Sequence, residues 1–148
     1  MTVAGVGEAV ARAAKPVSLF EQAGGEDGVR ALVDRFYDLM EQDPAYAELR
    51  EMHDNDLFPM RVSLTQFLTA WLGGPRDWFE ARPGACIMSA HRRFGITRET
   101  AAQWVHAMSR AIRDTRIDPP LAQRMQDAFL RMANAMTMQA ETIADQQH

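Results

Sequence analysis

Apolar residues recur at helical spacing along this chain, and this periodicity is the feature that most constrains its fold. From Val29 to Met40, apolar positions follow the i, i+3, i+4, i+7 pattern that places side chains on one face of an α-helix. A second stripe runs from Leu57 to Trp71 and ends at a Gly-Gly-Pro sequence, which stops a helix. No window shows the apolar alternation between turn residues that is typical of strands. We therefore expect an all-α fold.

Two further helices are expected in the second half of the chain. Thr97 can cap a helix that carries Trp104 and Met108 on its apolar face. Asp118 followed by Pro119 is a cap with proline at the first helical position, and it opens a last helix. The methionines of that helix are interpreted as adaptable core. About four substantial helices are therefore expected.

Residues 76 to 96, between the second and third of these helices, show no sustained period and contain Pro83, Gly84 and Gly95. An irregular segment of this length is uncommon in a small domain and often lines a binding site where it occurs. His91 lies inside it. The local sequence leaves three roles open for His91: a metal or cofactor ligand, a catalytic base, or a core histidine near a turn.

The composition indicates one globular domain without a nucleic-acid or membrane role. The 148 residues can bury one core, and a formal net charge of −4 gives no concentrated basic face for phosphates. No apolar run approaches the roughly 18 residues that span a bilayer. Cys86 is the single cysteine, which excludes an internal disulfide and a thiolate zinc site. We expect an N-terminal extension (1–17), a main domain (18–140) and a C-terminal tail (141–148) in a cytoplasmic protein.

Several motifs, taken in order, resemble the group II truncated haemoglobins over about residues 18 to 136. They are GGEDGVRALVDRFYDLM with its Phe36-Tyr37 pair, FLTAWLGGP, a lone histidine followed by Phe-x-Ile, and QWVHAM, in which Trp104 lies 13 residues after His91. The resemblance implies a shortened globin with two helices packed over two, haem b between them, and the proximal ligand on an irregular loop.

By this resemblance His91 is the axial iron ligand. Tyr37 and Trp104 correspond to the distal donors, whose O–H and N–H groups suit the partial negative charge of bound O₂. His53 would complete this cluster, with a solvent-facing loop histidine as the alternative. The remaining expected haem contacts are apolar: Met60 and Leu64 on the distal helix, and Phe67, Leu68, Phe94, Ile96 and Met108 in the walls.

The residues before His91 depart from the group II pattern. Members of that group usually carry two arginines there, which help to hold the haem propionates, whereas this chain has Cys-Ile-Met-Ser-Ala. Arg92, Arg93 and Arg61 are the expected substitutes, since arginine orients carboxylates well; plain surface charge is the alternative. In addition, Trp78 stands where a tyrosine is common.

The function implied by the resemblance is reversible binding of O₂, NO and CO at a five-coordinate iron. Two alternatives stay open. One is a haem redox enzyme of the NO dioxygenase, nitrite reductase or peroxidase type, which needs an electron donor such as a reductase. The other is a haem-free globin-fold protein that acts through protein contacts. A homodimer is left open as well.

Overall fold

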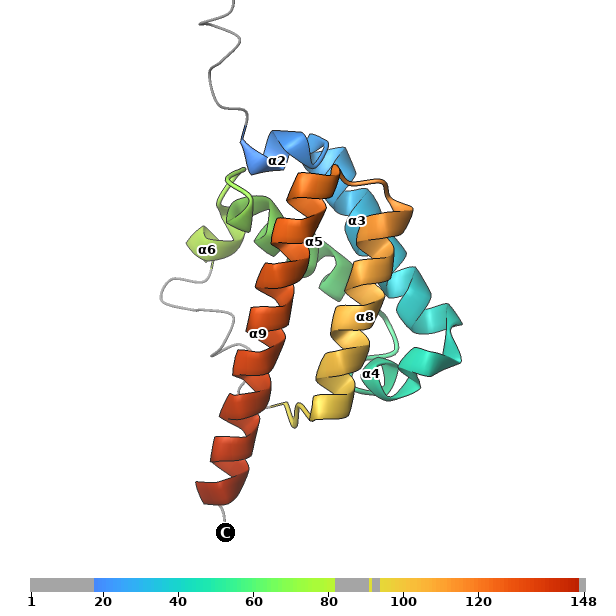
Figure 1. Cartoon of the computed structure of the whole chain (residues 1–148), viewed down its shortest axis with the longest axis vertical. Coiled ribbons are helices and arrows are strands. Elements are labelled where there is room, and N and C mark those ends of the chain that lie inside the picture. Colours follow the sequence, from blue (N-terminus) through green and yellow to red (C-terminus); the bar gives the residue numbers. More distant parts are fainter. Residues whose placement is uncertain (1–17, 82–90, 92–93, 147–148) are drawn as a thin grey trace, which may run out of the picture.

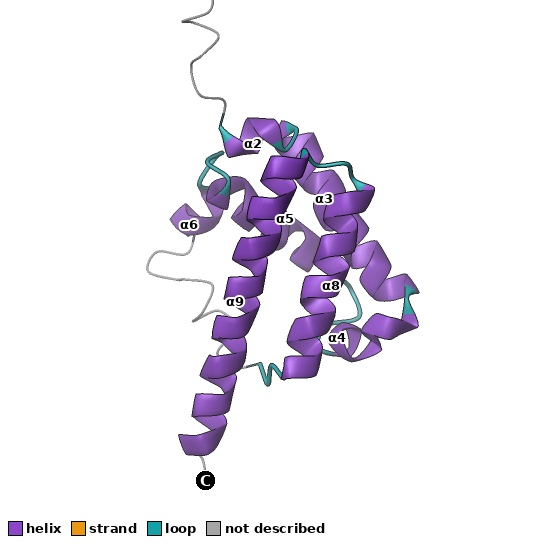
Figure 2. Cartoon of the chain, in the orientation of Figure 1, coloured by secondary structure: helices purple, strands orange, loops and turns teal. Residues whose placement is uncertain are grey.

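All regular structure in the described part of the chain is helical. The computed structural model describes residues 18–81, 91 and 94–146 (Figures 1 and 2). No strand occurs in these ranges, so the expected all-α class is confirmed. The helices, in chain order, are α2 (Leu19–Gln22), α3 (Gly25–Gln42), η1 (Pro44–Tyr46), α4 (Ala47–Glu51), α5 (Phe58–Trp71), α6 (Asp77–Ala81), α8 (Arg98–Asp114) and α9 (Pro119–Gln146).

The boundary between α2 and α3 depends on glycine. Ser18 caps α2, and its side-chain oxygen accepts a hydrogen bond from the Glu21 N–H at 3.1 Å. Gly24 and Gly25 then have φ values of +96° and +66°, in the left-handed region where glycine carries no steric cost. A Cβ on Gly28 would collide with the Ala23 carbonyl oxygen. The chain can therefore reverse tightly and start α3 directly against α2.

Helix α3 lies at the centre of the fold. It packs against α5 on one side and α8 on the other, and α8 in turn packs along α9 (Figure 1). The apolar stripes expected from the sequence face these contacts. Side chains in the core that are at most 2% exposed include Val33, Phe36, Met108, Ile112, Met125 and Phe129.

The caps of the last two long helices match the sequence. Thr97 and Thr100 form a reciprocal capping box at the start of α8, with bonds of 3.1 and 3.0 Å between each side chain and the other backbone N–H. Helix α9 continues to Gln146, so residues 141 to 146 of the expected tail are helical. Arg98 at the start of α8 pairs with Glu141 on this last part of α9 at 2.8 Å.

Short helices connect the long ones. The short helices η1 and α4 join α3 to α5. Helix α6 follows α5 and lies within residues 76 to 96, the segment that was expected to be irregular. None of the described helices is long and apolar enough to cross a membrane.

Candidate functional site

A cavity of about 480 Å³ lies among α3, α5, α8 and α9, and His91, Phe94 and Ile96 contribute to its lining. Its size is within the usual range of pockets that bind small molecules and cofactors. The cavity brings together residues from distant parts of the chain, most of them apolar. The predicted site residues that line it are Tyr37, His53, Met60, Leu64, Phe67, His91, Phe94, Ile96 and Trp104.

Tyr37 is the most deeply buried polar side chain in this lining. Helix α3 carries it, 2% of the residue is exposed, and its ring makes an edge contact with Phe36 at 4.9 Å between centroids. Burial raises the pKa of the phenol well above its ordinary value, an effect that the Arg61 charge partly opposes. Tyr37 therefore keeps its proton at any physiological pH and can act as a hydrogen-bond donor.

Trp104 lies on α8 and is held between aromatic neighbours from two helices. Its ring makes edge contacts with Phe36 of α3 at 6.2 Å and with Phe129 of α9 at 5.4 Å. Such contacts fix the orientation of an indole that is only partly buried. The indole N–H is a donor only, so Tyr37 and Trp104 supply two donors to one cavity.

His53 follows α4, and its ring lies 6.0 Å from that of Tyr37. Its Nδ1 lies 2.9 Å from the Leu49 carbonyl oxygen, which can only accept, so Nδ1 carries the proton. Burial lowers the pKa of this imidazole, although the bond to Leu49 opposes the shift. Neutral His53 therefore has an unprotonated Nε2, which accepts hydrogen bonds and does not donate them.

Three side chains of α8 hold the segment that leads to His53. Gln103 Oε1 accepts the Leu49 N–H at 3.0 Å. The Arg110 guanidinium donates to the Asp43 carboxylate at 2.6 Å and to the Tyr46 hydroxyl oxygen at 3.1 Å. The Tyr46 O–H is then available to donate to Nδ1 of His106, the third side chain of α8, at 2.6 Å.

This network has an electrostatic consequence at Asp43. A backbone hydrogen bond from Ala45, followed by the bond from Arg110, holds the pKa of the Asp43 carboxyl below its ordinary value. The carboxylate thus stays charged and keeps its ion pair with Arg110. These contacts from α8 side chains hold η1 and α4 in place.

His91 also lines the cavity, where it lies half-buried on a turn. The Phe94 N–H donates to the His91 carbonyl oxygen at 3.1 Å, and the two rings are 6.0 Å apart. The Ile96 N–H donates to the Phe94 carbonyl oxygen at 2.9 Å, just before α8 begins. The cavity thus has one imidazole on this turn and two neutral donors on the helices.

Some of the residues predicted to contact a cofactor do not line the cavity. Leu68 and Met108 are each 1% exposed and belong to the core beneath it. Arg61 is directed to α3, where its guanidinium binds Asp34, Asp38 and Glu41. The expectation that Arg61 holds a propionate therefore has no support in its contacts. Arg92 and Arg93 lie outside the described residues.

The lining also includes residues that were not predicted to belong to a site. Trp78 of α6 is 5% exposed, and its Nε1–H donates to Ser63 Oγ of α5 at 3.2 Å. Met132, Ala133 and Met136 come from α9. Their spacing marks an apolar helix face, but only the packing of α9 reveals that this face borders a cavity and not the solid core.

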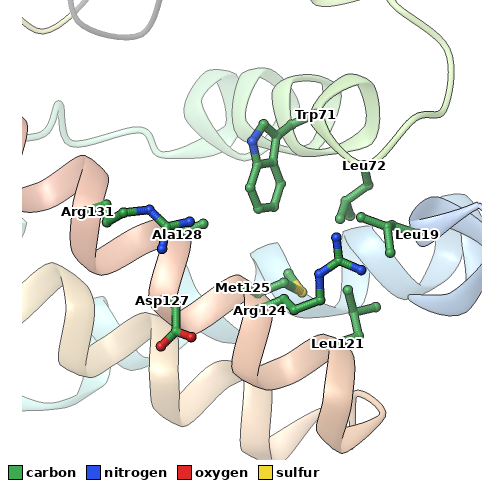
Figure 3. Close-up of a pocket in the computed structure, with 9 residues that line it drawn as sticks. All are labelled: Leu19, Trp71, Leu72, Leu121, Arg124, Met125, Asp127, Ala128 and Arg131. Atoms are coloured by element: carbon green, nitrogen blue, oxygen red, sulfur yellow. The ribbon is translucent and has the colours of Figure 1, made fainter.

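A second hollow, of about 310 Å³, lies between α2, the end of α5 and α9 (Figure 3). Trp71 lines it together with apolar residues, and Arg124, Asp127 and Arg131 are at its rim. The Trp71 ring lies 5.5 Å from that of Phe129, which contacts Trp104. Aromatic packing thus fills the space between the two hollows.

The main cavity suits a haem group by the chemistry of its residues. Haem iron needs one or two axial ligands from the protein, because the porphyrin supplies the other four, and neutral imidazole is a common axial ligand. His91 can provide that ligand. Apolar side chains such as Leu64 and Phe67 can cover the faces of a porphyrin. The two donors on α3 and α8 suit a polar ligand on the iron.

Comparisons with known proteins agree with this arrangement. The family model described as bacterial-like globin matches residues 18–138. Group 2 truncated hemoglobin YjbI of Bacillus subtilis (strain 168) is 33% identical over 91 residues, which cover 62% of this chain and 67% of that protein.

Solved structures show the same fold. The group II 2-on-2 hemoglobin of Agrobacterium tumefaciens superimposes with a TM-score of 0.79 at 30% identity, covering 83% of this chain and 95% of that one. The cold-adapted truncated hemoglobin of Pseudoalteromonas haloplanktis TAC125 gives a TM-score of 0.78 at 29% identity, with 81% and 97% covered. The chain therefore belongs to the bacterial-like globin family and is a haem globin with the 2-on-2 fold of the group II truncated haemoglobins.

Proposed function

We propose that this protein binds O₂, and the related gases NO and CO, reversibly at the iron of a haem b whose axial ligand is His91. The observation that carries the proposal is the shared cavity, where Tyr37 and Trp104 face the same space as His91. An imidazole ligand together with two neutral donors suits reversible binding of a gas that gains partial negative charge on the iron.

Haem, when bound, would supply the iron that takes up the gas, and His91 would hold that iron. Tyr37 and Trp104 would donate hydrogen bonds toward the gas, which carries partial negative charge when bound. The raised pKa of Tyr37 keeps its O–H intact for this purpose. His53, as an acceptor, would not add a third donor; it can accept a hydrogen bond within this cluster instead.

The apolar lining would keep bulk water from the haem. Leu64 and Phe67 of α5 and Met132 of α9 are partly or wholly buried around the cavity. Met60 and Phe94 are 39% and 37% exposed, so they lie at its rim. Fewer competing water molecules strengthen the hydrogen bonds from Tyr37 and Trp104.

The proposal is tested by loading the purified protein with haem, reducing it, and exposing it to O₂. We expect an absorption spectrum that changes on O₂ addition and returns when O₂ is removed, with a slow dissociation step in stopped-flow traces. Failure to take up haem would contradict the whole proposal. Rapid, repeated consumption of NO with an added reductant, in place of stable gas binding, would identify a haem redox enzyme.

A further inference from the structure

We propose that Arg61 is the positioning residue for Tyr37: it holds α5 against α3 beside the tyrosine and sets the electrostatic field on the phenol. This inference rests on the proposed role of Tyr37 as a donor to the bound gas. Arg61 is not among the residues that line the cavity, but it contacts the ring of Tyr37, which is. It would act through the tyrosine.

The contacts of Arg61 join the two helices at several points. One guanidinium nitrogen donates to the Asp34 side chain at 3.0 Å and to the Asp34 carbonyl oxygen at 3.1 Å. The other donates to Asp38 at 2.9 Å and to Glu41 at 3.3 Å. The guanidinium carbon lies 5.6 Å from the centroid of the Tyr37 ring, which is within the range of a cation–π contact.

The exposure of these groups shows which of them is fixed. The Arg61 side chain is 21% exposed, whereas the three carboxylates are 45 to 47% exposed. A planar guanidinium with several fixed partners has little freedom, unlike a single surface ion pair. The cation is therefore held at one place beside the ring, and the first turns of α5, which carry Met60, are held with it.

The charge balance makes the phenol sensitive to this cluster. Three acidic side chains surround one cation, so the local charge is negative overall. Arg61 is the member of this cluster that contacts the Tyr37 ring. Its positive charge opposes the effect of burial on the Tyr37 pKa. A nearby cation makes a phenol O–H more acidic and hence a stronger donor. Loss of Arg61 would weaken the donor and leave the carboxylates unbalanced.

The experiment compares Arg61→Met, Arg61→Lys and Asp38→Asn in the haem-loaded protein. The readouts are the O₂ dissociation rate and the C–O stretching frequency of the CO complex, which falls when a positive field faces the gas. Arg35→Met is the matched control. Arg35 lies on α3, as the partners of Arg61 do, and joins α3 to α8 through a 2.9 Å ion pair with Asp114. Among the described residues, no cation–π contact or hydrogen bond joins Arg35 to Tyr37.

We expect Arg61→Met to raise the C–O frequency and to speed O₂ dissociation about threefold or more, a change in line with loss of a cation–π contact. Arg61→Lys should give an intermediate value. Asp38→Asn removes a negative charge but keeps the cation, so it should shift the frequency in the opposite direction. Arg35→Met should leave both readouts at the wild-type value.

A merely structural role of Arg61 cannot shift the C–O frequency in opposite directions in Arg61→Met and Asp38→Asn, because both substitutions would then loosen the same contact between α3 and α5. Equal shifts of the same sign, or no shift, would overturn the inference. If the wild-type protein binds no haem, the proposed function fails by itself. The inference is then decided by NMR of ¹³C-labelled tyrosine in the haem-free protein, where Arg61→Met must move the Tyr37 ring signals and Arg35→Met must not.

Discussion

Two parts of the cavity lining are built in different ways. Tyr37 and Trp104 come from the long helices α3 and α8, which pack against each other through a buried core. His91 lies on a turn, where its carbonyl oxygen accepts the Phe94 N–H, and Phe94 is 37% exposed. Hydrogen-bond donors need close control of distance and angle, which helices provide. An axial ligand is held in addition by its bond to the metal, so a turn can carry it.

The largest effect should come from the turn. His91→Ala removes the only imidazole proposed to bind iron, and we expect haem retention at least about 100-fold weaker, since even indirect support of a metal ligand is worth up to that factor. Transfer of haem to a competing acceptor, followed by absorbance, measures the effect. Added imidazole should restore binding in the variant. Unchanged haem retention would mean that His91 does not bind the iron.

The next largest effect should come from the helical side. Tyr37→Phe keeps the ring packed against Phe36 but removes the O–H, and we expect O₂ dissociation about 10-fold faster, the value of one hydrogen bond to a charged acceptor. Stopped-flow kinetics measure this rate. Haem retention should stay at the wild-type level, in contrast to His91→Ala. A variant that loses haem instead would show that Tyr37 serves the fold and not the gas.

A smaller effect is expected where α8 supports the segment before His53. Gln103→Ala leaves the Leu49 N–H without its 3.0 Å acceptor, so the free energy of unfolding should fall by about 1 kcal/mol. Urea unfolding of the haem-free protein measures this change. Gln123→Ala is the control, because Gln123 makes an exposed bond to Asp127 at 2.9 Å and should cost almost nothing. Equal losses in the two variants would contradict a supporting role for Gln103.

The smallest expected effect is the pH dependence that His53 contributes. The pKa of His53 is lowered in the folded protein, chiefly by burial. At pH values between this lowered pKa and the ordinary pKa of 6.5, the unfolded chain therefore binds more protons than the folded protein. Stability from this group is therefore complete above 6.5 and is lost as the pH falls below it. His53→Gln should show a flatter stability profile between pH 5 and 7 than the wild type. Parallel profiles would argue that His53 is exposed.

The sequence predicted those parts of the fold that depend on local patterns. The stripe from Leu57 to Trp71 and the cap at Thr97 correspond to helices of the structure, because periodicity and capping are properties of neighbouring residues. Local patterns do not indicate where α9 ends. Residues 141 to 146 have a polar composition that gives little sign of helix, but the ion pair between Glu141 and Arg98 ties this end to α8.

The site was predictable only in part, for a physical reason. Tyr37 and Trp104 lie on apolar stripes, where local patterns indicate nothing beyond packing, and the resemblance to a family was needed to bring them together with His91. The partners of Arg61 could not be read in this way. Asp34 and Asp38 share one face of α3, but which side chain of α5 meets that face depends on how the two helices pack.

The most direct test of the account is the resonance Raman spectrum of the haem-loaded, reduced protein without gas. A haem iron bound by one neutral imidazole gives an iron–histidine stretching band. We predict this band in the wild type, its loss in His91→Ala, and its return when imidazole is added to that variant. A band that persists unchanged in His91→Ala would show that another residue binds the iron and would contradict the central claim.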